Sequence, residues 1–122
     1  MKPIPLTSDH PGFLVAEDGC DLWWCASIEE VCISIEPADL ESAEFWVMSV
    51  DGTTALDLSV RLVKGRIMSD YGPIEASAHA ATPDDLQQGM KIIKCWFDHQ
   101  NIAVPNRPLE ALRLAADMLR PL

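Results

Sequence analysis

Hydrophobic and polar residues alternate through the first two thirds of the chain, and this period of two is typical of β-strands that bury one face. Turn-forming residues divide the alternating region into short pieces, and Asp51-Gly52 and Lys64-Gly65 are the clearest turn dipeptides. The strands predicted in this way are residues 13–16, 21–27, 31–35, 45–50, 56–62, 66–69 and 74–80. Residues 1–12 contain three prolines and are expected to form an extended arm before the first strand.

Two segments are compatible with more than one structure. Residues 38–44 are predicted to form a short helical turn or a loop. Residues 53–63 are predicted to be a strand, but Leu56, Val60 and Val63 also fit the spacing of a helix. The helical alternative therefore stays open at this stage.

The hydrophobic period lengthens to that of a helix in the last third of the chain. Thr82 is a favourable N-cap, Pro83 suits the first helical position, and apolar residues then recur every three or four positions up to Phe97. These features predict a helix over residues 83–99. A second helix is predicted over residues 107–120, where leucine and alanine form one apolar stripe.

Strands followed by two helices predict an α+β fold. We expect an antiparallel sheet of about five to six strands with the two C-terminal helices packed on one face. The chain of 122 residues, 48% of them hydrophobic, fits a single domain over 1–122, with residues 13–80 mainly in strands. The apolar face of the strand predicted at 74–80 is mostly alanine, so another element should approach it closely.

Charge is distributed unevenly along the chain, whose net charge is −10. Residues 1–51 contain eleven acidic residues and one base, Lys2, whereas residues 52–122 contain eight of each sign. Several bases of the second half lie on helix faces that are predicted to be exposed, so we expect one face of the protein to stay strongly negative. This charge argues against direct binding to nucleic acids and to anionic membranes, since both attract Lys and Arg.

The sequence also bears on the cellular compartment. No apolar run approaches the roughly 20 residues that cross a bilayer. The first 19 residues lack the apolar stretch of a secretory signal. We therefore expect a cytoplasmic protein whose cysteines are reduced.

The four cysteines do not form a familiar metal or redox motif. They are Cys20, Cys25, Cys32 and Cys95. The spacing contains neither a C-x-x-C pair nor the two close pairs of a structural zinc site. We therefore predict buried small hydrophobic side chains, with no metal and no cofactor. A zinc site would need His79 or His99 as a further ligand.

Known catalytic motifs are absent from the sequence. It contains no nucleophile turn, phosphate-binding loop, H-E-x-x-H or dinucleotide fingerprint. We therefore expect a protein that is not an enzyme and assign no catalytic residue. The alternative is a small enzyme or ligand-binding domain with a pocket between sheet and helices, near Tyr71, His79 or Cys95.

Two pairs of adjacent aromatic residues lie on predicted strands, Trp23-Trp24 and Phe45-Trp46. Neighbouring residues on a strand point to opposite faces of the sheet. If the two C-terminal helices cover only one face, one member of each pair is exposed beside the acidic residues. Exposed tryptophan is a favoured anchor for protein partners.

These features predict a small acidic binding protein of a bacterium or phage that inhibits a basic protein partner, such as a toxin, a nuclease or a nucleic-acid-binding effector. By size and charge, the analogy is to immunity proteins and to nucleic-acid mimics that block restriction or CRISPR machinery. A self-associating subunit, for example a homodimer that buries the open sheet face, is a further alternative. The predicted partner-binding residues are Glu17, Asp18, Asp21, Trp23, Trp24, Glu29, Glu30, Glu36, Asp39 and Glu41.

Overall fold

The structure is a computed structural model that describes residues 12–18, 20–64 and 69–121. Its strands form one antiparallel sheet in the order β2-β1-β3-β4-β5. They are β1 (Phe13–Glu17), β2 (Asp21–Cys25), β3 (Phe45–Ser49), β4 (Thr54–Lys64) and β5 (Ser69–Ala80). The helices are α1 (Ile28–Ser34), α2 (Pro37–Ser42), α3 (Pro83–His99) and α4 (Pro108–Leu119).

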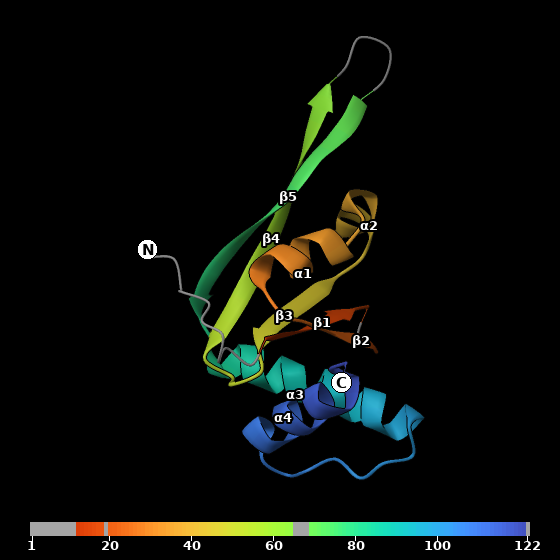
Figure 1. Cartoon of the computed structure of the whole chain (residues 1–122), viewed down its shortest axis with the longest axis vertical. Helices are drawn as coiled ribbons and strands as arrows, with labels where there is room; N and C mark the ends of the chain where they lie inside the picture. Colours follow the sequence, from red (N-terminus) through yellow and green to blue (C-terminus); the bar gives the residue numbers. More distant parts are fainter. Residues whose placement is uncertain (1–11, 19, 65–68, 122) are drawn as a thin grey trace.

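The sheet lies between two helical layers, as Figure 1 shows. α3 and α4 pack against one face, and α1 and α2 cover the opposite face. The predicted α+β fold with two C-terminal helices on one face is thus confirmed. The layer formed by α1 and α2 was not predicted, and it removes the open sheet face on which the exposure of the aromatic residues depended.

Successive side chains along the strands point to opposite faces of the sheet, and they contribute to a hydrophobic core on each face. On β1, Leu14 and Ala16 face α3 and α4, while Phe13 and Val15 face α1 and α2. The antiparallel register places Leu14 opposite Met48 of β3, and the two side chains share one core. Because all four of these β1 residues are buried, β1 is the centre of both layers.

The strand predicted at residues 31–35 is wrong, because this segment belongs to α1. The alternation placed Val31, Ile33 and Ile35 on one face, yet Val31 and Ile35 are buried while Ile33 is 75% exposed. Val31 and Ile35 are four residues apart, as on one face of a helix, and they pack in the core beneath α1. Ser27 at the N-cap and Glu30 three residues later begin the helix.

The other predicted elements agree with the structure to within two residues, except the strand predicted at 74–80, which is part of β5 and begins earlier, at Ser69. α3 has the predicted bounds, α4 begins and ends one residue inside them, and the helical turn expected near 38–44 is α2. Residues 54–64 form β4, so the helical alternative for 53–63 is wrong. The arm expected over 1–12, the turn at Lys64-Gly65 and the strand expected at 66–69 lie outside the described residues, except at their edges. Within the described ranges, no helix combines the length and apolar character needed to cross a bilayer.

Gly89 and the alanine-rich part of β5 both allow close packing, but against different partners. Gly89 is buried on α3, and a Cβ atom there would lie 2.4 Å from the Trp46 ring. On β5, Ala76 and Ala78 pack in the core beneath α1 and α2, so the close approach predicted for this strand is confirmed. The small residues therefore set the distances of both helical layers from the sheet.

Candidate functional site

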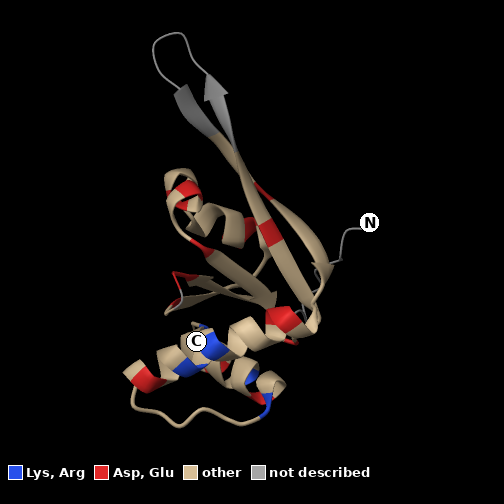
Figure 2. Cartoon of the chain, turned by 180° about the vertical axis from the view of Figure 1, so that it is seen from behind, with Lys and Arg blue, Asp and Glu red and all other residues tan. Residues whose placement is uncertain are grey.

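Acidic and basic residues are separated between the layers of the fold. Figure 2 shows the Lys and Arg residues of 81–121 on or beside α3 and α4, and two further bases, Arg61 and Lys64, belong to β4. Residues 81–121 contain five residues of each sign and are balanced. Residues 12–60 and 72–80, which include α1, α2 and most of the sheet, contain no Lys or Arg. Their twelve acidic residues are Glu17, Asp18, Asp21, Glu29, Glu30, Glu36, Asp39, Glu41, Glu44, Asp51, Asp57 and Glu75.

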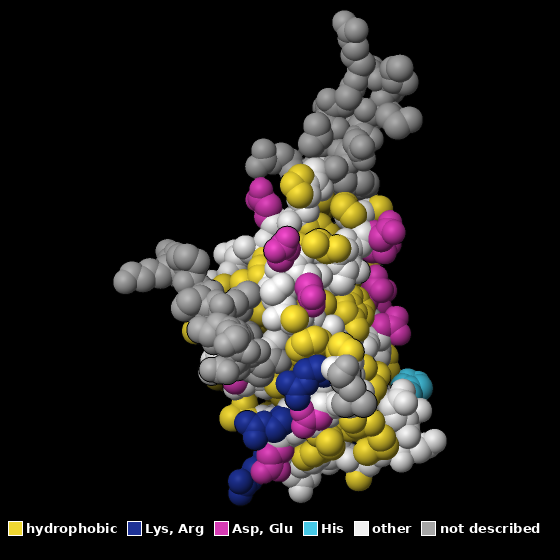
Figure 3. All heavy atoms as spheres, viewed as in Figure 1, with side chains coloured by type: hydrophobic (Ala, Val, Ile, Leu, Met, Phe, Trp, Pro, Cys, Tyr) yellow, Lys and Arg dark blue, Asp and Glu magenta, His cyan; other side chains and the backbone are white. Residues whose placement is uncertain are grey.

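In the layer formed by α3 and α4, the ion pairs join residues that are close together in the sequence. Arg107 lies 3.8 Å from Glu110, and Arg120 lies 2.9 Å from Asp117, in both cases three residues apart. These arginines therefore pair with acidic residues of their own layer. In the view of Figure 3, the dark-blue side chains of the described residues lie in the lower part of the molecule, together with some acidic ones, and the other magenta side chains lie above them.

An acidic cluster surrounds the turn between β1 and β2. Asp18 fixes this turn against the start of β3, because its N–H donates to the Glu44 carbonyl oxygen at 2.9 Å and its Oδ1 accepts from the Glu44 N–H at 3.1 Å. The pKa of Glu17 is raised by desolvation and by the nearby carboxylates of Asp39, Asp18 and Asp21. The structure thus brings Asp39 of α2 near Glu17, which precedes it by 22 positions.

Predicted residues on α1 and α2 divide into different roles. Glu29 is exposed in the first turn of α1, and Glu36 and Glu41 are exposed at or on α2. Glu30 is committed to the fold, since its Oε2 accepts a hydrogen bond from the Ala26 N–H at 2.6 Å. Most of the predicted carboxylates are therefore available to solvent, while Glu30 also caps a helix.

The two predicted aromatic anchors, Trp23 and Trp24, are half-buried. Trp23 packs with the α1 and α2 core, and its Nε1 donates to Ser34 Oγ at 3.1 Å. Trp24 packs with the α3 and α4 core on the other face, as the strand geometry predicts. Both rings therefore contribute to the cores, and neither is a fully open anchor.

Cys20 and Cys95 form a disulfide that links the β1–β2 turn to α3 across 75 residues of sequence. The expectation that all cysteines are reduced is wrong for this pair. Burial raises the pKa of the Cys25 thiol, and burial also raises that of Cys32. The prediction of a buried small side chain fits Cys25, while Cys32 is only partly buried.

His99 completes a compact group with this disulfide. Its Nδ1 lies 3.2 Å from Cys20 Sγ, 4.0 Å from Cys95 Sγ and 2.9 Å from the Cys95 carbonyl oxygen. A carbonyl oxygen only accepts, so Nδ1 carries the hydrogen and closes the last turn of α3. His99 was expected at this helix end, but its position beside the sulfur atoms was not predicted.

A hollow of about 390 Å³ opens beside Cys20, between β2 and the end of α3. It is lined by Cys20, Asp21, Leu22, Trp23, Trp96, His99 and Gln100. The ligand-pocket alternative placed a pocket near Tyr71, His79 or Cys95. This hollow lies next to Cys95, and neither Tyr71 nor His79 lines it.

Cys20, Cys95 and His99 also form a group of potential metal ligands among the described residues. The ligand atoms of Cys20, Cys95 and His99 all lie within 4.8 Å of one another. Two thiolates and one imidazole are a ligand set that zinc accepts. With Cys20 and Cys95 joined in a disulfide, neither sulfur is a thiolate, so this group holds no metal in its oxidised form.

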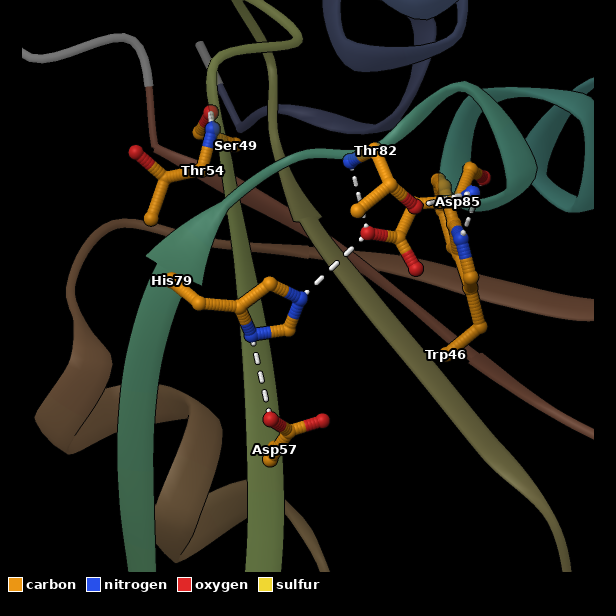
Figure 4. A network of polar contacts seen from close by, with 7 residues as sticks. All are labelled: Trp46, Ser49, Thr54, Asp57, His79, Thr82 and Asp85. Carbon is orange, nitrogen blue, oxygen red and sulfur yellow. Dashed lines mark hydrogen bonds and ion pairs between the residues drawn. The ribbon is translucent and has the colours of Figure 1, made fainter.

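His79 belongs to a polar network that joins β4, β5 and α3, drawn in Figure 4. Its Nδ1 lies 3.0 Å from Asp57 Oδ2 and its Nε2 lies 3.3 Å from Asp85 Oδ2. The contact with Asp57 lacks hydrogen-bond geometry, which leaves Nδ1 buried without a hydrogen-bond partner among the described atoms. Asp85 also accepts from the Thr82 N–H at 2.9 Å, and its carbonyl oxygen accepts from Trp46 Nε1 at 3.1 Å. The network therefore fixes the start of α3 against the sheet.

Comparisons with protein-family models, curated proteins and solved structures found no match. Two features stand out, namely the acidic region made by α1, α2 and the β1–β2 turn, and the Cys20–Cys95–His99 group. The sequence suggested the first through its charge distribution. It could not suggest the second, because Cys20 is far from Cys95 and His99 along the chain.

Proposed function

We propose that this chain is a small acidic protein that binds and inhibits a basic protein partner. The observation that carries the proposal is the separation of charge, with twelve acidic residues and no Lys or Arg over residues 12–60 and 72–80. The described arginine ion pairs lie within the opposite layer. A surface of this kind attracts a positively charged protein and repels acidic ones.

The binding surface we propose centres on the β1–β2 turn and α2, where desolvation and the carboxylates of Asp39, Asp18 and Asp21 all raise the pKa of Glu17. Repulsion among these carboxylates is relieved when a Lys or Arg of a partner approaches them. Glu29, at the start of α1, extends the same charge. Such electrostatic attraction raises association rates by roughly 10- to 1,000-fold at low ionic strength and falls steeply with salt.

Two kinds of inhibitor fit this surface, and competition separates them. A nucleic-acid mimic occupies the site at which its target binds DNA or RNA, so nucleic acid displaces it. An immunity protein of a toxin can bind elsewhere on its target. For either kind we propose a cytoplasmic protein of a bacterium or phage, where basic nucleases and effectors act.

A capture experiment with matched variants tests the proposal. The immobilised full chain is exposed to a lysate of bacterial cells at low salt, and captured proteins are identified and then assayed for activity with and without the chain. The double variant Asp21→Lys/Asp39→Lys is expected to lose the captured protein. The control Asp98→Lys/Glu110→Lys has the same net charge but alters the balanced layer, and it is expected to retain the captured protein.

Circular dichroism confirms that both variants are folded. Capture of a basic protein that the chain inhibits, lost only in the first variant, supports the proposal. Equal capture by both variants, or a captured protein whose activity the chain leaves unchanged, contradicts it. The self-association alternative loses its original reason, because α1 and α2 cover the sheet face that it required to be open.

A further inference from the structure

The disulfide between Cys20 and Cys95 lies at the surface, next to the polar side chain of His99. Cys20 is in the β1–β2 turn and Cys95 is in the last turn of α3, and both are only partly buried. His99 follows Cys95 by one helical turn and is exposed. A disulfide in such a position is accessible to reagents from solvent, unlike the thiol of Cys25, which is buried.

Two independent observations single out Cys20 as the reactive sulfur. The first is a hydrogen bond that the His99 Nδ1–H shares between the Cys95 carbonyl oxygen and Cys20 Sγ, because Nδ1 lies 3.2 Å from Cys20 Sγ but 4.0 Å from Cys95 Sγ. The second is access, because the hollow beside the disulfide is lined by Cys20 and His99 but not by Cys95.

We propose that Cys20 and Cys95 form a redox-active disulfide that exchanges with thiols through Cys20. An external thiolate attacks Cys20 Sγ from the hollow, forms a mixed disulfide with Cys20 and releases Cys95 as a thiolate. A second external thiolate then attacks the external sulfur of the mixed disulfide. This step releases Cys20 as a thiolate that the His99 N–H stabilises. The protein disulfide gains two electrons, and the two thiols are oxidised to one external disulfide.

The charge around the hollow indicates which thiols react best. Asp21 lines the hollow, and Glu17 and Asp18 lie in the same turn. These carboxylates repel an anionic thiol and attract a cationic one. The substrate class is therefore a neutral or positively charged thiol, including a cysteine in a basic protein segment. Reversible exchange would also suit the proposed cytoplasmic location, where stable structural disulfides are rare.

The first experiment uses the wild-type chain and needs no substitution. The oxidised protein is treated briefly with cysteamine, quenched with acid, alkylated and mapped by mass spectrometry. The cysteamine adduct is expected mainly on Cys20, because Cys20 lines the hollow and Cys95 does not. Equal adducts on the two cysteines, or an excess on Cys95, would overturn the assignment.

A second experiment tests the part played by His99. In the Cys95→Ser background, the rate at which Cys20 reacts with cystamine is measured as a function of pH. Substituting His99→Ala is expected to move the midpoint of this profile to higher pH, because the N–H that stabilises the thiolate is lost. Gln100→Ala is the control, since Gln100 lines the same hollow. An unchanged profile in the His99 variant, or an equal displacement in the control, contradicts the role of His99.

The third experiment tests the substrate class. Reduction by cysteamine and by 3-mercaptopropionate is compared, with each rate divided by the thiolate concentration. Cysteamine is expected to react roughly tenfold faster at low ionic strength, and the ratio should approach one in about 1 M salt. Asp21→Asn should lower the low-salt ratio. Equal rates at low salt would contradict the preference for cationic thiols, whatever the outcome of the search for a protein partner.

Discussion

Ser27 and Glu30 begin α1 together, because Ser27 Oγ accepts a hydrogen bond from the Glu30 N–H at 3.1 Å. The Glu30 carboxylate in turn accepts one from the Ala26 N–H at 2.6 Å. Two donors that would otherwise be unsatisfied at the helix start are thereby paired. Glu29, the adjacent acidic residue, points its charge to solvent from the same turn. This difference separates a residue needed for folding from one available for binding.

Reversal of the two charges should therefore have unequal effects on stability. Both Glu29→Lys and Glu30→Lys place a positive charge near the helix N-terminus, but only the second removes a capping hydrogen bond. The free energy of unfolding of Glu30→Lys is expected to be about 1 kcal/mol lower than that of Glu29→Lys. Urea denaturation of the two variants measures the difference. Equal stabilities would show that the Glu30 contact contributes nothing to the fold.

Gly89 should resist replacement although alanine favours helices. Alanine improves helix propensity by about 1 kcal/mol, yet its Cβ would lie 2.4 Å from the Trp46 ring. The ring cannot move freely, because its Nε1 donates to the Asp85 carbonyl oxygen. We expect Gly89→Ala to lower the free energy of unfolding by about 1–3 kcal/mol, and the exposed Gln87→Ala to change it by less than about 0.5 kcal/mol. A stabilised Gly89 variant would mean that Trp46 packs elsewhere.

Asp85 should give α3 a stability that depends on pH. The pKa of Asp85 is lowered, mainly by the hydrogen bond from the Thr82 backbone N–H and also by His79. A carboxylate with a lowered pKa stabilises the fold above its unfolded value of 3.8, and this contribution is lost as the pH falls through its folded pKa. Asp85→Asn should lower the free energy of unfolding by about 1 kcal/mol at pH 7, and the deficit should shrink in acid. The exposed Asp84→Asn is the control, and an equal deficit there would argue against this network.

Glu17 should behave in the opposite way. Its pKa is raised by desolvation and by Asp39, Asp18 and Asp21, so its ionisation disfavours the folded state once the pH exceeds the raised value. Glu17→Gln is therefore expected to raise the melting temperature at pH 7 and low salt, and the gain should fade as salt screens the neighbours. Glu110→Gln, which loses a contact with Arg107, should show no gain. A lower melting temperature for Glu17→Gln would contradict the repulsion between Glu17 and its neighbouring carboxylates.

The sequence was sufficient to predict the elements in which local pattern and tertiary packing agree. α3 combines an N-cap, a proline at the first position and an apolar stripe, and its bounds were predicted correctly. In α1 two patterns compete, since alternation of Val31, Ile33 and Ile35 suggested a strand while Ser27 and Glu30 form a helix start. The capping pair is the signal in the sequence that indicates a helix here, and only α1 of the second helical layer was predicted as a strand.

Parts of the candidate site depend on contacts that sequence spacing cannot reveal. Cys20 and Cys95 are 75 residues apart, and only the packing of α3 against β2 brings them together. The charge distribution, by contrast, was visible along the chain, because residues 12–60 contain no base. Where these charges lie in space is known only from the fold, which places the bases of residues 81–121 in the layer formed by α3 and α4 (Figure 2).

The most direct test of this account is the electrostatic potential near individual backbone amides. NMR relaxation caused by a cationic and an anionic nitroxide of the same size gives this potential residue by residue, without a known partner. We predict strongly negative values over residues 17–21 and 28–44 and values near zero over residues 84–118. Similar potentials in the two regions would contradict the separation of charge on which the proposed function depends.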